Sequence, residues 1–184
     1  MPRVKPVFRP GDCPENADAQ TRQELAEFFE QLFPGNPAPE IDTGHTGLAL
    51  AAHNPKFAGN LSRLTRGAVL EMGWTRRRDL TELAIQAVNL HFGSAFSFET
   101  RMPNAEATGL GMERLAALPL WKTSGLFDEE QRLVLEYVDA VVTGEVPDAL
   151  FDRVRARYGE KGTVEFTALI GTFSLWAMLI NATL

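Results

Sequence analysis

Two short rows of polar side chains interrupt a mostly apolar stretch of the sequence. One row has the spacing i, i+4, i+7 and the other i, i+3, i+7, so each row shares one face of a helix. The rows are Glu82, Gln86 and Asn89, followed by Ser94, Ser97 and Arg101. Gly93 lies between them, so we expect two helices joined by a tight turn.

The charged members of these rows support two interpretations. A buried carboxylate needs a partner, and Arg101 is the nearest cation on the element that follows Glu82. In the first interpretation the two residues form a structural ion pair that ties the helices together. In the second they line a polar pocket, where Glu82 exchanges a proton and Arg101 holds an anion. Ser94 and Ser97 would then orient a substrate oxygen by hydrogen bonding.

Histidine and aromatic residues are further candidates for this pocket. His91 lies beside the Gly93 turn and is a candidate proton carrier, although a lone histidine at a helix end is commonly structural. The three histidines of the chain lack close spacing, so we expect neither a metal nor a cofactor. Aromatic residues suited either to a pocket wall or to ordinary core packing are Phe92, Phe96, Phe98, Trp121, Phe173 and Trp176, and we assign Phe96 and Phe98 to substrate binding.

The single cysteine, Cys13, excludes a dithiol redox cycle within one chain. Peroxidase chemistry through Cys13 would require a second molecule. Cysteine usage therefore favours a reducing, cytoplasmic location. The formal net charge of −6 argues against nucleic acid as a partner.

Apolar residues recur at helical spacing along most of the chain, which predicts an all-α fold. We expect an extended arm and one helix in residues 1–50 and a helical domain in residues 51–184. Within that domain, Asp79 is expected to cap a helix, Pro103 to bend or break the next one, and Gly162 to separate the last two.

The C-terminal segment Phe166–Leu184 carries no charge and approaches the length of a membrane span. Five of its residues are Ser, Thr or Asn, and no basic flank marks a cytoplasmic edge. These features favour a buried helix over a membrane anchor. A subunit interface is one place where such a helix could be buried.

From His53 to the C-terminus the chain resembles the carboxymuconolactone decarboxylase family, which includes alkylhydroperoxidase D-like proteins. The resemblance is carried by the Gly93 turn with its following helix and by Thr81–Ile85, Ala107–Leu110, Leu126–Glu130 and Val164–Gly171. In the alkylhydroperoxidase branch a glutamate precedes a Cys-x-x-Cys pair, and a histidine follows four residues after the second cysteine. That pattern places the glutamate at Glu82 and the cysteines at Ser94 and Ser97. The histidine position falls on Arg101.

The resemblance implies a bundle of helical hairpins that assembles into dimers, trimers or hexamers. It also implies cofactor-independent acid–base chemistry on a small cyclic dicarboxylate. Arginine stays charged where histidine would exchange protons, so Arg101 is expected to bind an anion. We therefore expect a lyase or isomerase that acts on a small anionic organic acid or lactone, without dithiol peroxidase activity. The alternative is a non-catalytic binding or scaffold protein with a structural Glu82–Arg101 pair.

Overall fold

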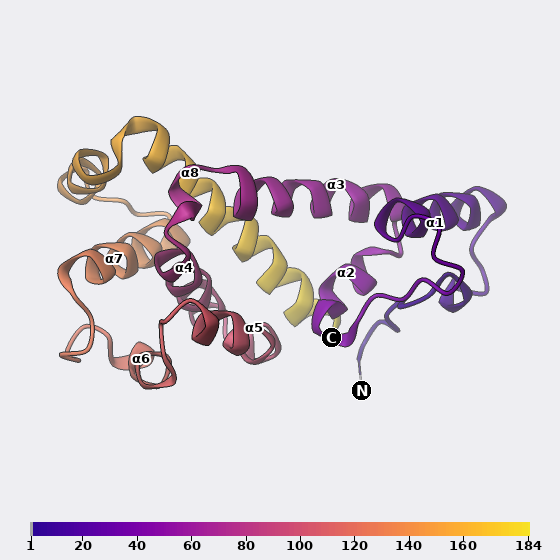
Figure 1. Ribbon diagram of the computed structural model, residues 1–184, viewed down its shortest axis with the longest axis horizontal. Helices are drawn as coiled ribbons and strands as arrows, with labels where there is room; N and C mark the ends of the chain where they lie inside the picture. The colour runs from indigo at the N-terminus through magenta and orange to yellow at the C-terminus, as the bar shows by residue number, and fades with distance from the viewer. Residues whose placement is uncertain (1) are drawn as a thin grey trace. The chain divides into compact units, whose positions relative to one another are not determined.

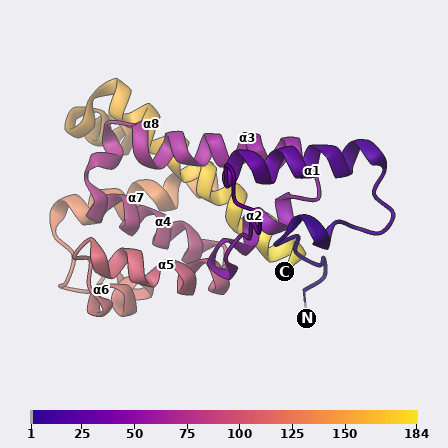
Figure 2. The same ribbon diagram turned by 45° about the vertical axis from the view of Figure 1, so that its right-hand side comes forward.

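The computed structural model describes residues 2–184, and within this range it contains helices but no strands, which confirms the all-α prediction (Figures 1 and 2). Residues 2–184 form eight α-helices, with short 3-10 turns between several of them. The chain divides into two compact units, one formed by residues up to Thr65 with Leu179–Leu184 and the other by Arg66–Met178. The second unit contains both rows of polar side chains.

In the first unit, an N-terminal arm lies against helices α1 (Ala19–Leu32) and α2 (Thr46–Ala51). The backbone of the arm is held by hydrogen bonds such as the one from the Val7 N–H to the Ala49 carbonyl, at 2.9 Å. Helix α1 begins after Asp18, whose carboxylate accepts from the Thr21 N–H at 2.7 Å.

Helix α3 (Pro55–Arg66) begins after Asn54, whose side chain accepts from the Phe57 N–H at 3.0 Å. One turn of π-helix, Gly67–Glu71, follows it and starts the second unit.

Helix α4 (Arg78–His91) is central to the second unit and packs against α5 (Ala95–Ala107) and α7 (Glu129–Thr143). It is buried at every position from Leu80 to Asn89. A helix buried on all sides must place its polar residues against partners, since unpaired polar groups are costly in a core. The remaining helices are α6 (Met112–Ala117) and α8 (Asp148–Thr183).

The prediction for the start of α4 is wrong, and of the bend or break predicted at Pro103 in α5 the break does not occur. Helix α4 starts one residue before Asp79, which lies in its first turn and accepts hydrogen bonds from the Arg77 guanidinium instead of capping the helix. Helix α5 runs through Pro103 without a break. A proline removes only one helical hydrogen bond, and burial of Ala105 in the next turn holds the helix in place.

The interruption in α8 lies at Gly159, three residues before the predicted separator. Gly159 has φ 72° and ψ 173°, a conformation open almost only to glycine. Gly162 is helical, and a Cβ added there would lie 2.9 Å from the Cβ of Tyr158. Within the described residues α8 is also the one helix with the length and apolar composition of a membrane span, and half of that window is buried.

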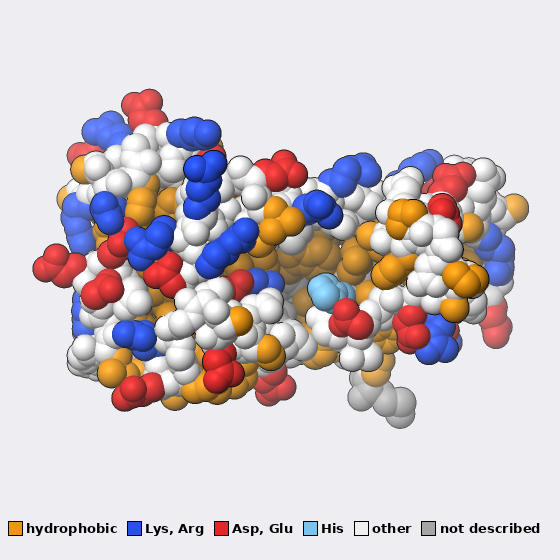
Figure 3. All heavy atoms as spheres, in the orientation of Figure 1, with side chains coloured by type: hydrophobic (Ala, Val, Ile, Leu, Met, Phe, Trp, Pro, Cys, Tyr) orange, Lys and Arg blue, Asp and Glu red, His pale blue; other side chains and the backbone are white. Residues whose placement is uncertain are grey.

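Basic and acidic side chains are interspersed over the face of the molecule drawn in Figure 3. In the second unit many of them are paired. Glu130, for example, lies 3.1 Å from the Arg77 guanidinium and 2.9 Å from that of Arg157. The Tyr158 hydroxyl donates a hydrogen bond to the same carboxylate at 3.3 Å.

Candidate functional site

The six polar residues of the two rows lie together where α4 meets α5, and we call them the polar strip; five are buried and Arg101 is partly exposed. The turn that aligns them is closed by the Ser94 N–H, which donates to the Asn89 carbonyl at 2.8 Å. Gly93 supports this turn with φ 61°, a value that favours glycine. The predicted juxtaposition of the two rows is therefore confirmed.

Glu82 and Arg101 form the charged end of the polar strip. Arg101 Nε donates to Glu82 Oε2 at 3.1 Å, and Nη2 donates to Oε1 at 2.5 Å. The side chain of Glu82 is 8% exposed and that of Arg101 is 23% exposed. This fork fixes both groups and leaves Nη1 as the guanidinium nitrogen that Glu82 does not use.

The Phe173 ring of α8 lies beside this pair, with its centroid 5.1 Å from the guanidinium carbon of Arg101. A ring face attracts a cation, so Phe173 helps to hold the Arg101 guanidinium in place. Phe173 was named from the sequence only as one of several aromatic residues. Its contact with Arg101 depends on tertiary packing that no local spacing reveals.

The neutral end of the polar strip satisfies its own hydrogen bonds. Gln86 Nε2 donates to the Phe98 carbonyl at 3.1 Å, and Asn89 Nδ2 donates to Gln86 Oε1 at 3.3 Å. Ser94 Oγ donates to Ser97 Oγ at 2.9 Å. The two hydroxyls are buried and bonded to each other, so a substrate oxygen would have to replace that bond.

Three charged residues of α4 and α7 have partners other than the Glu82–Arg101 pair. On α4, Arg78 donates to the Val69 carbonyl at 2.7 Å, and Asp79 is held by Arg77. On α7, Glu136 pairs with Arg153 at 2.8 Å. The Glu82–Arg101 pair therefore lies in a largely apolar setting, where each charge depends on the other.

Of the two predicted wall residues, Phe98 packs against the core of the second unit and Phe96 is half-buried. Their carbonyls also accept hydrogen bonds, from Gln86 and from Thr100 Oγ1 at 2.9 Å. Both residues thus flank the polar strip through α5.

His91 lies on another face of α4. It follows Glu82 by nine residues, or two and a half helical turns, so the two side chains point in opposite directions. The structure does not bring His91 together with Glu82 and Arg101.

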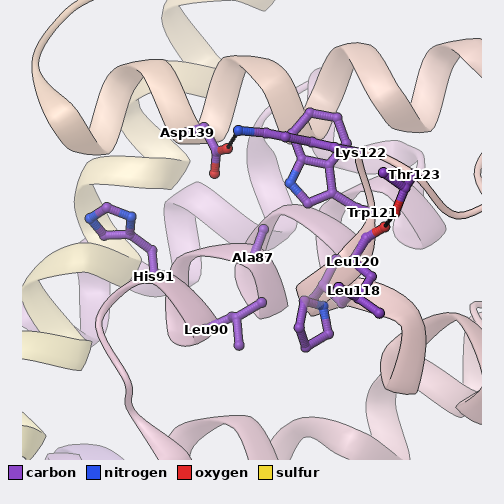
Figure 4. Close-up of a pocket in the computed structure, with 10 residues that line it drawn as sticks. Ala87, Leu90, His91, Leu118, Leu120, Trp121, Lys122, Thr123 and Asp139 are labelled. Atoms are coloured by element: carbon purple, nitrogen blue, oxygen red, sulfur yellow. Dashed lines mark hydrogen bonds and ion pairs between the residues drawn. The ribbon is translucent and has the colours of Figure 1, made fainter.

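A cavity of about 340 Å³ opens on the His91 side of α4, and we call it the α4–α7 cavity (Figure 4). Its walls come from the end of α4, from the 3-10 turn Leu118–Leu120 with the loop that follows, and from α7. The lining residues are Ala87, Leu90, His91, Leu118, Pro119, Leu120, Trp121, Lys122, Thr123 and Asp139. Sequence analysis named His91 and Trp121 but did not predict this cavity, because its walls lie far apart along the chain.

One weak ion pair crosses the rim of this cavity. Lys122 Nζ lies 3.3 Å from Asp139 Oδ2 and 5.3 Å from the centroid of the Trp121 ring. The two charged side chains are 71% and 41% exposed, so solvent screens their attraction.

Metal ligands are not grouped in either place. Among residues 2–184 no cluster of three or more His, Cys, Asp or Glu side chains could hold a metal ion. Cys13 lies in the first unit and is partly buried.

Comparisons with known proteins give two curated relatives. No family model matches the chain, and no solved structure matches it. YnjA of Escherichia coli K12 is 41% identical over 85 residues, which cover 45% of this chain and 46% of YnjA. YdfG of Bacillus subtilis 168 is 26% identical over 102 residues, which cover 54% of this chain and 67% of YdfG. Both relatives are described as uncharacterized proteins.

Proposed function

We propose that this chain is a divergent protein of the carboxymuconolactone decarboxylase type. Its proposed activity is that of a lyase or isomerase without a cofactor, acting on a small anionic organic acid or lactone. The observation that carries the proposal is the Glu82–Arg101 fork, in which a buried acid meets a cation that is partly open to solvent. The two positions are the ones that the family resemblance assigns to a proton-transfer pair.

Arg101 is the group that would receive the substrate. Its free Nη1 can donate to a carboxylate or to a lactone carbonyl oxygen, and its planar fork suits either. An anion at Arg101 competes with Glu82 for the same positive charge. Glu82 then lies in an apolar setting with less compensation and becomes a better proton acceptor.

The chemistry that follows is proton transfer at carbon. Glu82 takes a proton from the carbon next to the substrate carbonyl, and the electron pair of that C–H bond moves to the carbonyl oxygen, which Arg101 stabilises. Return of the proton to a different carbon gives an isomer. In the lyase reaction a carboxylate leaves instead of a proton: carbon dioxide departs, the electron pair of its C–C bond moves to the carbonyl oxygen beside Arg101, and protonated Glu82 then gives its proton to that carbon.

Turnover by the Glu82→Gln variant tests this proposal. The full chain is screened against lactones and unsaturated dicarboxylates by ultraviolet absorbance, with Glu99→Gln as the matched control. Glu99 lies exposed on α5 and outside the polar strip. We expect Glu82→Gln to lose at least about 100-fold in rate, since general acid–base catalysis contributes that much or more. Equal turnover by both variants would overturn the assignment.

The second candidate function is that of a non-catalytic binding or scaffold protein. It is favoured by the closure of the fork, because both carboxylate oxygens of Glu82 already accept hydrogen bonds from Arg101. If it is correct, the double variant Glu82→Leu, Arg101→Met folds normally, and the wild-type chain turns over none of the tested acids and lactones.

Self-association is part of the proposal. Val164 and Met178 lie exposed on α8, four turns apart on the same face, and offer apolar surface to a second copy. Sedimentation of the wild-type chain beside a Val164→Glu, Met178→Glu variant is expected to show an oligomer only in the wild type. A wild-type monomer at micromolar concentration would contradict this part of the proposal.

A further inference from the structure

The α4–α7 cavity contains an arrangement that suits an ammonium ion, and a side chain of the protein already occupies it. The Lys122 ammonium lies over the Trp121 indole and beside the Asp139 carboxylate (Figure 4). An aromatic face combined with a carboxylate is the pairing that recognises organic cations in proteins. Lys122 thus stands where the charged head of a ligand would lie.

We propose that this cavity is a binding site for a small amphipathic amine, whose ammonium group displaces Lys122 from Trp121 and Asp139. The site lies on the opposite face of α4 from the polar strip, so the inference does not depend on the proposed function. It assigns a second ligand, of opposite charge, to the same helix.

The walls of the cavity explain why the ligand must also have an apolar part. Ala87 and Leu118 are buried at its floor, whereas Leu90 and Leu120 are exposed at its mouth without an apolar cover. A volume of about 340 Å³ lies at the lower end of the range for small-molecule sites. One ring or a short aliphatic chain would cover the leucines and leave the ammonium at the rim.

The charges around the cavity favour a cation over an anion. Asp139 supplies a fixed negative charge, and α4 directs the negative end of its helix dipole to His91, its last residue. His91 in its neutral form can also accept a hydrogen bond from an ammonium group. Once Lys122 has moved away, no other lysine or arginine lines the cavity within the described residues.

Displacement of Lys122 costs little, because its side chain is long, exposed and held by a screened ion pair. Lys122 is therefore a competitor of the ligand and not a contributor to its binding. This point separates the proposal from an anion site, in which Lys122 would be the main attractive group.

Calorimetric titration of the full chain with phenethylammonium tests the proposal, with 3-phenylpropanoate as an anionic probe of similar size. We expect the cation to bind and the anion to bind more weakly or not at all. Lys122→Met is expected to strengthen cation binding about 3-fold, and Asp139→Asn to weaken it about 10-fold. Trp121→Leu is expected to weaken it about 5-fold. Lys161→Met, which removes another exposed lysine, serves as the control and should leave the affinity unchanged.

The sign of the Lys122→Met effect decides the result. Weaker cation binding in this variant, or tighter binding of 3-phenylpropanoate than of phenethylammonium, overturns the proposal. Equal cation affinity in Asp139→Asn and wild type also overturns it. Failure of both wild type and Lys122→Met to bind phenethylammonium at millimolar concentration has the same consequence.

Discussion

Opposite faces of α4 support two sites of contrasting construction. On one face Glu82 is almost fully buried and bonded twice to Arg101. On the other, Lys122 and Asp139 make a single contact at the rim of an open cavity. A cation and a carboxylate are paired in both places. In the buried pair each charge needs its partner, whereas solvent can replace either partner in the exposed pair.

This contrast indicates how each site would respond to a ligand. In the proposed function, a ligand at the polar strip must compensate for the buried charge of Glu82 that it uncovers. A ligand at the α4–α7 cavity displaces a side chain that solvent readily accepts. Chemistry is therefore assigned to the buried pair and simple binding to the exposed one.

The largest expected effect comes from breaking the buried pair on one side. Arg101→Met leaves Glu82 buried without its partner and should lower the free energy of unfolding by about 3–5 kcal/mol. Urea unfolding at pH 7 measures this change. Arg155→Met, which breaks an exposed pair with Asp152, is the control and should cost about 1 kcal/mol or less. Equal losses in the two variants would mean that burial does not distinguish the pairs.

A smaller loss is expected from the neutral end of the polar strip. Gln86→Leu removes the acceptor for Asn89, which stays buried, and a donor to the partly buried Phe98 carbonyl. An unsatisfied buried polar group costs about 1–3 kcal/mol, which thermal unfolding can resolve. A Gln23→Leu variant, changed at an exposed glutamine of α1, should unfold like the wild type. A similar loss there would show that the change of residue, not the buried position, is responsible.

Glu130 provides an intermediate case, since its side chain is 20% exposed and contacts two arginines. Burial acts to raise its pKa, but hydrogen bonds from Arg157 and Arg77 outweigh it and hold the pKa below the ordinary value of 4.5. A lowered pKa in the folded state means that the pair stabilises the fold above pH 4.5 and that this contribution is lost as the pH falls through the folded-state value. The stability difference between wild type and Glu130→Gln should therefore shrink on acidification. Urea unfolding between neutral and acidic pH measures it, and a constant difference would contradict the prediction.

The smallest effect is expected at the cavity rim. Lys122→Met should change the free energy of unfolding by no more than about 1 kcal/mol, because both members of its pair are exposed. Chemical denaturation of Lys122→Met and Arg101→Met under the same conditions compares their free energies of unfolding directly. A loss as large as that of Arg101→Met would show that the rim pair is structural and not exchangeable.

The sequence was sufficient to predict the polar strip but not the cavity. Helical spacing places Glu82, Gln86 and Asn89 on one face, and Gly93 sets the turn that brings α5 against them. The cavity depends instead on how the turn at Leu118 and the side chain of Asp139 meet α4. These contacts depend on packing between segments that are distant in the sequence. Hydrophobic periodicity predicts local helices but not such contacts.

Local errors had a similar origin. Gly162 and Gly159 are both glycines near the start of an apolar run, and only the backbone conformation shows that the positive φ falls on Gly159. Asp79 has the residue type of a cap, but the guanidinium of Arg77 competes for its carboxylate and the helix starts earlier. In both cases the residue type was predicted correctly, but the sequence could not show which of several neighbouring residues takes the role.

The shortness of the α4–α5 connection has a consequence for the order of folding. Glu82 and Arg101 are only 19 residues apart, so their meeting requires closure of a small loop between two helices. The cavity needs Ala87 to meet Asp139, with α5, α6 and the 3-10 turn Leu118–Leu120 in between. During refolding the polar strip is therefore expected to gain protection from solvent first and the cavity later, once α7 has docked.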